Sequence, residues 1–340
     1  MIDVDGAYGE GGGQLVRTAV ALSALTGKPL RLANVRASRA RPGLAPQHLA
    51  ALRAVASLCD AAATGLELRS TAFTFEPRAR PAGGELRVDV GTAGSVTLVL
   101  QAVLPVLLAA RGASRVVVTG GTDVRQAPTW DYFREVLLRL LGRMGVDVHA
   151  TLVRRGYYPH GGGEVALEVQ PGTPKPISFE NSIASWRLAG QAHVARLPRS
   201  IAERMRASAL AALPQAGIEV TTEQSAGPGG GITLWAESDA GLLGASRVAE
   251  RGVPAEALGG AAGHELAADL ASGATLDVHL ADQSLVYLAL ARGDSSFVAR
   301  ELSSHTRTAI WLLAQFLPVR VTAQPAGGLV KLAVQHLAER

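Results

Sequence analysis

The sequence predicts an α/β (α+β) fold made of three βαβαββ repeats with a small inserted α/β domain. Strand and helix patterns recur in the same order three times along the 340 residues. A segment from 171 to 273, with the loop-like edges PGTPKP and ASG, separates the second recurrence from the third. Apolar residues make up 48% and charged residues 18%, which is typical of a globular chain with a large core.

The first repeat is expected to contain two helices and four strands. Its elements are a strand at Ile2–Asp5, a helix from Gln14 to Leu25, a strand at Leu30–Arg36, a helix at Gln47–Cys59, and strands near Leu66–Ser70 and Ala72–Glu76.

The second and third repeats follow the same order. The second has strands at Leu86–Val90, Arg115–Thr119, Val146–Val153 and Glu164–Val169, with helices at Ala93–Ala110 and Trp130–Met144. The third has strands at Leu276–His279, Ser296–Val298, Val319–Thr322 and Leu329–Val334, with helices near Ser284–Leu290 and Thr306–Phe316.

We expect three domain segments: repeats one and two at 1–170, the inserted α/β domain at 171–273, and repeat three at 274–340. Elements expected in the insertion are strands near Ala189–Ala195, Glu219–Gln224 and Gly231–Glu237, and helices near Ala202–Leu213 and Pro254–Ala271. Each repeat would carry two helices on one face of a sheet. Since that face must be buried, the three repeats are expected to pack with their helices inward around a shared core.

Composition narrows the class of protein. Aromatic residues amount to 4%, so the core must be built mainly from Ala, Val and Leu. Cys59 is the sole cysteine, which fits a reducing cytoplasm. The start of the chain lacks the pattern of a signal peptide, and the apolar stretch Val96–Ala110 is shorter than a membrane span. The sequence therefore predicts a cytoplasmic protein that does not enter a membrane.

The glycine-rich turn Gly9–Gln14 lies between the first expected strand and helix. Glycines let a ligand approach the backbone, and a helix N-terminus favours an anion. Arg17 could add a cation there, and Glu10 could hold a divalent metal near a phosphate. A purely structural turn explains the glycines equally well.

Three further clusters carry polar residues. Arg36, Arg39 and Arg41 could form a phosphate clamp or a solvated edge. Gln101 lies in an apolar helix and needs a partner, which a core group or a ligand could supply. The segment Arg155–Glu164 (RGYYPHGGGE) has more glycines than a simple hairpin needs.

The third repeat contributes two candidates. In His279-Leu280-Ala281-Asp282-Gln283, the aspartate is expected to cap a helix. His305 follows two serines that can cap the next helix, which places it in the first turn. A helix N-terminus disfavours the imidazolium, and the neutral ring is a competent nucleophile.

Together these motifs resemble the RNA 3′-terminal phosphate cyclase family. The resemblance rests on GEGGGQ, PGLAPQHL, GTAGSVTLVLQ, GGTD, RGYYPHGGG and LADQ, in that order over nearly the whole chain. It implies three repeats similar to the C-terminal domain of a translation initiation factor, with a small domain inserted before the third. The family's nucleophilic histidine lies in the last repeat, and His305 falls at its place. Non-catalytic relatives lack this histidine, so the chain resembles the catalytic (type 1) branch.

The resemblance implies a three-step reaction. His305 would take AMP from ATP, the RNA 3′-phosphate would accept it to give RNA(3′)pp(5′)A, and the vicinal 2′-hydroxyl would expel AMP to leave a 2′,3′-cyclic phosphate. Mg²⁺ or Mn²⁺ would assist. The residues implied are Gln101, His279, Leu280, Ala281, Asp282 and Gln283 for the adenylate, Arg17, Arg36 and Arg39 for the RNA phosphate, and Glu10 for the metal.

The implied partner is RNA with a 3′-phosphate end, and DNA 3′-phosphates are a further substrate class. Two other hypotheses compete. A non-catalytic RNA-processing protein on the same fold is disfavoured by His305. An enolpyruvyl transferase, built from related repeats, is disfavoured by three repeats and an inserted domain, since those enzymes usually have six repeats.

Overall fold

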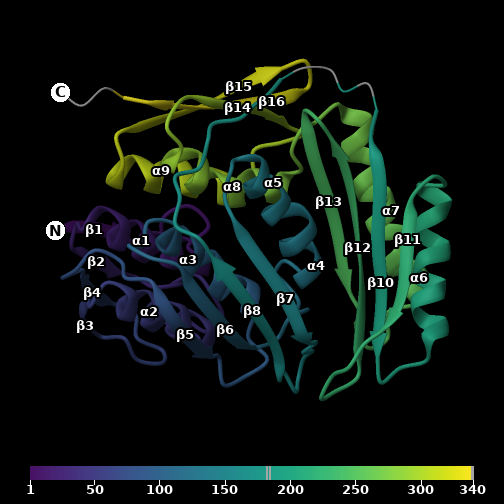
Figure 1. Cartoon of the computed structure of the whole chain (residues 1–340), viewed down its shortest axis with the longest axis horizontal. Helices are drawn as coiled ribbons and strands as arrows, with labels where there is room; N and C mark the ends of the chain where they lie inside the picture. Colours follow the sequence, from purple (N-terminus) through teal and green to yellow (C-terminus); the bar gives the residue numbers. More distant parts are fainter. Residues whose placement is uncertain (181–182, 184, 338–340) are drawn as a thin grey trace.

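The computed structural model describes residues 1–180, 183 and 185–337 (Figure 1). Its strands form four sheets of four strands each, and three of these sheets share one topology. In each of the three, two parallel strands lie side by side and an antiparallel pair completes one edge, which is the βαβαββ pattern. The predicted α/β class and the threefold repeat are therefore confirmed.

The first unit agrees with its prediction except at one strand. It contains β1 (Ile2–Asp5), α1 (Gly13–Thr26), β2 (Leu30–Ala33), α2 (Pro46–Leu58), β3 (Ala62–Thr64) and β4 (Phe73–Glu76), with sheet order β1-β2-β4-β3. The strand predicted at Leu66–Ser70 is wrong. That segment is a turn in which Arg69 has a left-handed φ of 65°, and the pairing strand precedes it.

The second unit has the same order. It contains β5 (Gly84–Asp89), α3 (Val96–Leu108), β6 (Ser114–Gly120), β7 (Val148–Arg154) and β8 (Gly163–Val169), with sheet order β5-β6-β8-β7. Its second helix is continuous over the predicted range but contains a π-helical stretch. It runs as α4 (Trp130–Tyr132), the π-helical η1 (Phe133–Leu137) and α5 (Leu138–Arg143).

The third unit is interrupted in the sequence. It contains β9 (Ser178–Phe179), α8 (Val278–Leu290), β14 (Ser295–Ala299), α9 (Ser304–Phe316), β15 (Val319–Ala326) and β16 (Leu329–His336), with sheet order β15-β16-β14-β9. The first strand predicted at Leu276–His279 is wrong, because Asp277 caps α8 there by accepting from the backbone N–H groups of His279 and Leu280. The helix cap predicted at Asp282 is wrong for the same reason, since Asp282 lies inside α8. The parallel partner of β14 is β9, which precedes the insertion.

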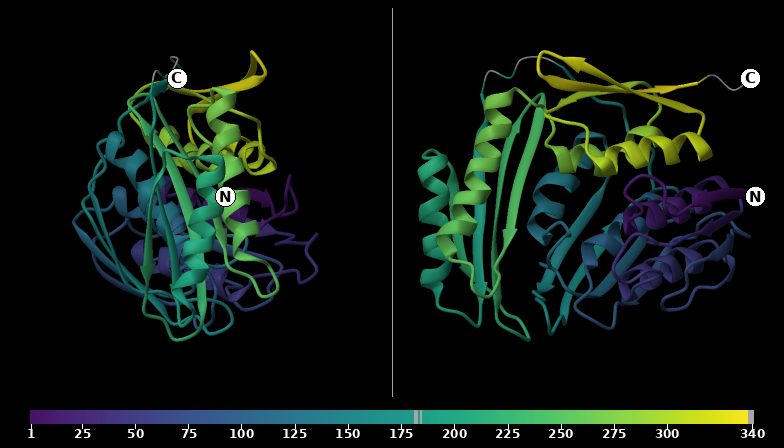
Figure 2. Two further views of the ribbon diagram at one scale, coloured as in Figure 1. Left: turned by 90° about the vertical axis from the view of Figure 1, so that its right-hand side faces the viewer. Right: turned by 180° about the vertical axis from the view of Figure 1, so that it is seen from behind.

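The inserted segment forms its own sheet and helix layer. It contains β10 (Arg187–Ala195), α6 (Arg199–Ala212), β11 (Gly217–Thr222), β12 (Gly229–Ser238), β13 (Gly241–Val248) and α7 (Ala255–Ser272), with sheet order β11-β10-β12-β13. Strand β13 was not predicted. Helices α6 and α7 cover the outer face of this sheet (Figure 2). The two ends of the inserted segment lie side by side at the edge of the third unit. There the Thr275 hydroxyl donates to the Phe179 carbonyl over 2.9 Å.

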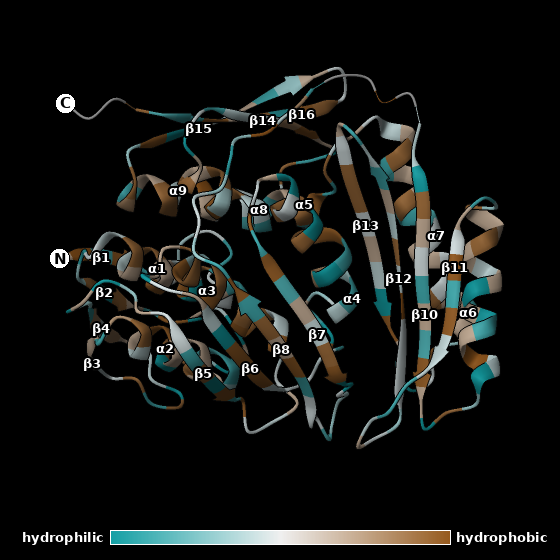
Figure 3. Ribbon diagram, in the orientation of Figure 1, coloured by the Kyte–Doolittle hydropathy of each residue, from teal (hydrophilic) through white to brown (hydrophobic). Residues whose placement is uncertain are grey.

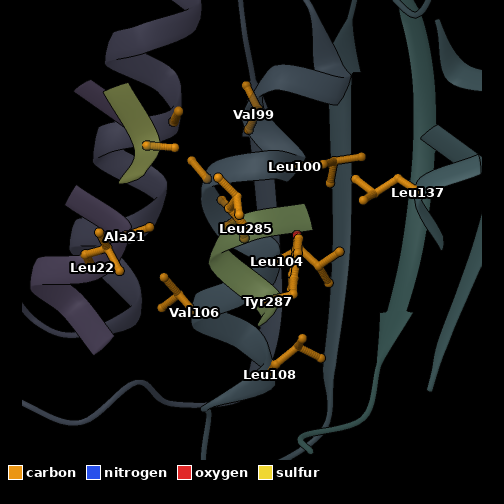
Figure 4. Packing of buried hydrophobic residues seen from close by; sticks show 14 of the residues in the cluster. Ala21, Leu22, Val99, Leu100, Leu104, Val106, Leu108, Leu137, Leu285 and Tyr287 are labelled. Carbon is orange, nitrogen blue, oxygen red and sulfur yellow. The ribbon is translucent and has the colours of Figure 1, made fainter. Parts of the chain in front are cut away.

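One hydrophobic core joins the three units, as predicted. Helices α1, α3, α8 and α9 meet at its centre, and Figure 4 shows residues such as Leu22, Leu104 and Leu285 packing between them. Helix α3 is almost entirely hydrophobic in Figure 3, since it is covered on nearly all sides. The insertion has a separate core between its sheet and its helices. Among the described helices, none combines the length and apolar character needed to cross a membrane.

A buried charge network joins the second unit to the insertion. Arg155, 1% exposed, donates from Nη2 to the Asp131 carboxylate at 2.8 Å and from Nη1 to the Asp123 carboxylate at 3.1 Å. His193 of β10 lies against both carboxylates, with Nδ1 3.5 Å from Asp131. Gly244 on β13 is required nearby, since any Cβ there would collide with Val136 and Tyr132. The start of the RGYYPHGGG segment is therefore a domain contact.

We predict that Arg155→Met lowers the free energy of unfolding by about 3–5 kcal/mol, because it leaves two buried carboxylates without their cation. Urea unfolding of both proteins measures the difference. The matched control is Arg154→Met, since the Arg154 side chain is half exposed. This control should stay within about 0.5 kcal/mol of the parent. Equal losses for the two variants would show that the network does not stabilise the fold.

Candidate active site

A pocket of about 580 Å³ lies where the three units and the insertion meet. Helices α1, α2, α3, α8 and α9 each contribute residues from their N-terminal halves. Those residues are Gly13, Gln14 and Arg17 of α1, Gln47 and His48 of α2, Leu98 and Gln101 of α3, His279, Asp282 and Gln283 of α8, and His305 of α9. The N-terminus of a helix carries partial positive charge and free N–H groups, so this convergence favours an anionic ligand.

His305 sits on the pocket wall in the first turn of α9, as predicted. The Ser303 hydroxyl caps this helix by accepting from the Thr306 N–H at 2.9 Å. The imidazole is 40% exposed, so one side remains open to the pocket. Burial lowers the pKa of His305, Arg17 and Arg39 lower it further, and the Asp282 carboxyl opposes them. The lowered pKa favours the neutral ring, which is the nucleophilic form.

Glu10 faces His305 from the glycine-rich turn before α1. Its Oε2 lies 2.5 Å from Nδ1 of His305, although the angle is not that of a hydrogen bond. Its Oε1 accepts from the Arg39 guanidinium. A carboxylate beside Nδ1 favours a proton on that nitrogen, which leaves the lone pair on Nε2. The turn is fixed against α9, since a Cβ at Gly9 would collide with Thr308.

Arg17 is the clearest anion-binding candidate on the wall. Its side chain is 6% exposed, and it has no hydrogen bond or ion pair to any residue that the structure describes. Burial lowers the pKa of its guanidinium to about 10. A buried cation without a counter-charge is unfavourable by itself. The position therefore favours an anion bound in the pocket.

The other two predicted arginines also line the pocket but differ in their partners. Arg36 donates to the carbonyls of Arg41 and Gly43, at 3.1 and 2.9 Å, and its φ of 52° places it in the left-handed region. Arg39 is paired with Glu10. Each retains donors for a phosphate, because a guanidinium has five N–H groups. Arg41 does not line the pocket.

The predicted adenylate residues divide into two groups. Gln101 donates to the Gln283 side chain over 2.7 Å, so the polar group in the apolar helix α3 is satisfied by its counterpart on α8. His279 and Asp282 share the pocket wall with them. Leu280 and Ala281 point into the hydrophobic core and do not line the pocket. The two groups on α8 face different sides of the helix, because all five residues from His279 to Gln283 lie within it and successive helical side chains point in different directions.

His48 is a pocket residue that we did not select from the sequence. Its Nδ1 accepts from the Ala45 N–H at 3.1 Å, so its Nε2 carries the proton. Burial, Arg17 and Arg36 lower the pKa of His48 to about 3, which keeps the ring neutral. The ring touches Gly13, where a Cβ would collide with Nε2. The pocket is also lined by residues that the sequence did not indicate as site residues, namely Gln126, Ala127, Pro128, Tyr132, Ser246, Arg247 and Glu265.

The fold and the pocket together indicate a class of protein. Helix N-termini, an unpaired buried arginine and an accessible histidine are features that suit an anionic ligand such as a phosphate. The chain is therefore an α/β protein with a pocket suited to anions.

Comparison with known proteins identifies the family. The profile of the RNA 3′-terminal phosphate cyclase family matches residues 8–323. An RNA 3′-terminal phosphate cyclase of Nitrosospira multiformis is 51% identical over 339 residues, covering 98% of this chain and 96% of its own. One of Pyrobaculum neutrophilum is 44% identical over 333 residues, covering 96% of each chain. The chain therefore belongs to the RNA 3′-terminal phosphate cyclase family, a family of ligases.

A solved structure is also similar. The enolpyruvyl transferase NikO from Streptomyces tendae aligns with a TM-score of 0.40 and 14% identity, over 98% of this chain and 48% of that chain.

We predict that Arg17→Met raises the melting temperature in phosphate-free buffer, equivalent to about 1–3 kcal/mol, because it removes a buried unpaired charge. Inorganic phosphate should stabilise the wild type by binding the native state, and the variant much less. Thermal melts over a phosphate series measure both effects, with Arg154→Met as the control. A variant that melts lower and still responds fully to phosphate would contradict the assignment.

We predict a pH-dependent gain in stability for Asp282→Asn. Burial raises the pKa of Asp282 from 3.8 to about 7. The folded protein thus holds this proton more tightly than the unfolded chain, and its stability falls as pH rises from about 4 to 7. Asparagine stays neutral, so the variant should equal the wild type at pH 4 and exceed it by roughly 2–4 kcal/mol at pH 8.

Thermal melts at pH 4, 6 and 8 test this, and the exposed Asp239→Asn is the control. A gain independent of pH would show that ionisation of Asp282 is not its source.

Proposed function

We propose that this chain uses ATP to convert an RNA 3′-terminal phosphate to a 2′,3′-cyclic phosphodiester, with His305 carrying AMP. The observation that supports this most is the neutral, accessible His305 at a helix N-terminus, inside the pocket that also contains the unpaired Arg17. Family membership supports the cyclase reaction, and the mechanism is our inference from the site.

In the first step, Nε2 of His305 attacks the α-phosphorus of ATP, a phosphoramidate bond forms, and pyrophosphate leaves. The side chains that would hold the adenylate are those of Gln101, Gln283, His279 and Asp282, which line the pocket. Leu280 and Ala281, which lie in the core, would act only by shaping α8. Arg39 and the helix N-termini offset the charge that develops on the leaving group.

In the second step, an oxygen of the RNA 3′-phosphate attacks the phosphorus of the histidyl-AMP and releases the imidazole, forming RNA(3′)pp(5′)A. Arg17, Arg36 and Arg39 would bind that phosphate. In the third step, the 2′-oxygen attacks the same 3′-phosphorus, loses its proton and expels AMP. The arginines serve this step by proximity, because they hold the phosphorus beside the hydroxyl.

Glu10 is the proposed carboxylate ligand of a divalent cation. The donor set fits Mg²⁺ or Mn²⁺, since such ions bind through one or two carboxylates together with substrate phosphates. Glu10 projects into the pocket beside His305, where ATP phosphates would lie. A bound cation would neutralise charge on those phosphates. The buried and unpaired Cys59 fits a reducing compartment, and we propose the cytoplasm.

We predict that the wild type retains label after incubation with ATP labelled at the α-phosphate and a divalent cation, followed by denaturation. The bond should be acid-labile and alkali-stable, and His305→Ala should retain none. His149→Ala, at an exposed histidine that does not line the pocket, is the matched control and should label normally. Equal labelling of His305→Ala would refute the mechanism. Labelling without cyclisation of RNA or DNA 3′-phosphates would favour another acceptor.

A further inference from the structure

An aromatic pair stands at the surface beside the candidate active site. The rings of Tyr8 and Trp311 stack with centroids 3.9 Å apart and planes inclined by 16°. Tyr8 is 41% exposed. Only Tyr8 and Tyr158 among the aromatic side chains of the described residues are exposed to this degree, in a chain with 4% aromatics. We call Tyr8 and Trp311 the stacking pair.

The stacking pair is built on the same two segments that build the site. Tyr8 lies in the turn that presents Glu10, and Trp311 lies in the helix that presents His305. The turn and α9 are in direct contact. The Glu10 N–H approaches the Thr308 hydroxyl at 3.4 Å, and Gly9 packs directly on Thr308. The stacking pair therefore has a set position relative to His305.

A cation lies on the same face of α9. Arg307 and Trp311 are four residues apart, so they share one side of the helix. Arg307 is exposed and has no ion pair or side-chain hydrogen bond with any other described residue. Trp311 is itself only half-buried, and it supports the exposed ring of Tyr8. An exposed arginine beside an exposed aromatic ring is a combination that binds a single-stranded nucleic acid through a phosphate and a base.

We propose that the stacking pair and Arg307 bind the nucleotides just before the 3′-phosphate of the RNA substrate, an inference that rests on the proposed function. From His305 to Trp311 the axis of α9 advances about 9 Å. If the bases at the 3′ end stay stacked on one another, with a spacing of about 3.4 Å as in a duplex strand, this axial advance corresponds to two or three steps. The base second or third from the 3′ end would then stack on Tyr8, while Arg307, on the side of α9 that bears Trp311, would contact a backbone phosphate of the same segment.

The binding assay uses a single-stranded RNA decamer with a 3′-phosphate, labelled at its 5′ end with fluorescein, and a matched decamer with abasic residues at the second and third positions. Base stacking on an aromatic side chain contributes roughly 1–3 kcal/mol. Wild type should therefore bind the abasic decamer about 5- to 150-fold more weakly. Tyr8→Leu should bind the intact decamer with that same loss and no longer distinguish the two. Tyr8→Phe, which keeps the ring, should behave as the wild type.

Arg307→Gln provides a second test that does not depend on the stacked rings. It should weaken binding of both decamers alike and reduce the slope of log K against log salt by about one. Arg115→Gln, an exposed arginine on the outer side of β6, is the matched control and should change neither quantity.

The possible results distinguish the stacking contact, the phosphate contact and the proposed function from one another. If wild type binds and cyclises the intact decamer but Tyr8→Leu still distinguishes it from the abasic one, the stacking proposal is overturned and the proposed function stands. If Arg307→Gln leaves the salt slope unchanged, the phosphate contact is overturned. If wild type binds 3′-phosphate and 3′-hydroxyl decamers equally and cyclises neither, the proposed function itself has failed.

Discussion

The buried guanidinium of Arg155 is the interaction on which the arrangement of the molecule depends most. It neutralises Asp123 and Asp131 in the second unit at the surface where β10 of the insertion arrives with His193. Two carboxylates cannot stay ionised there without it. Because Ser246, Arg247 and Glu265 of the insertion line the pocket, this network also determines one wall of the candidate site.

The second constraint is the inward packing of the helices. Burying their apolar faces in one core forces five helix N-termini toward one region, where side chains from all three units meet. The same packing keeps water from Arg17 and His48, which lowers the pKa of both groups. The electrostatics of the site are therefore a consequence of how the core is built.

The elements that were predicted correctly from the sequence are those with a clear local spacing of apolar residues. The helices around Gln14, Gln101 and His305 and the repeat order were recovered because apolar spacing is strong there. The third unit's first strand was misplaced, since Leu276–His279 alternates like a strand while Asp277 caps a helix, and the two-residue β9 is too short to show a pattern. Leu280 and His48 show the same limit: whether a side chain faces a core or a pocket depends on neighbours distant in sequence.

The discontinuity of the third unit has a consequence for biosynthesis. Ser178 pairs with Ser296, 118 positions later, so the ribosome must finish the whole insertion before the last sheet can close. Contacts this distant in sequence are slow to form and are made late. The unit completed last is the one that carries His305. A nascent chain consequently acquires its nucleophile in working position only after the rest of the polypeptide has emerged and folded.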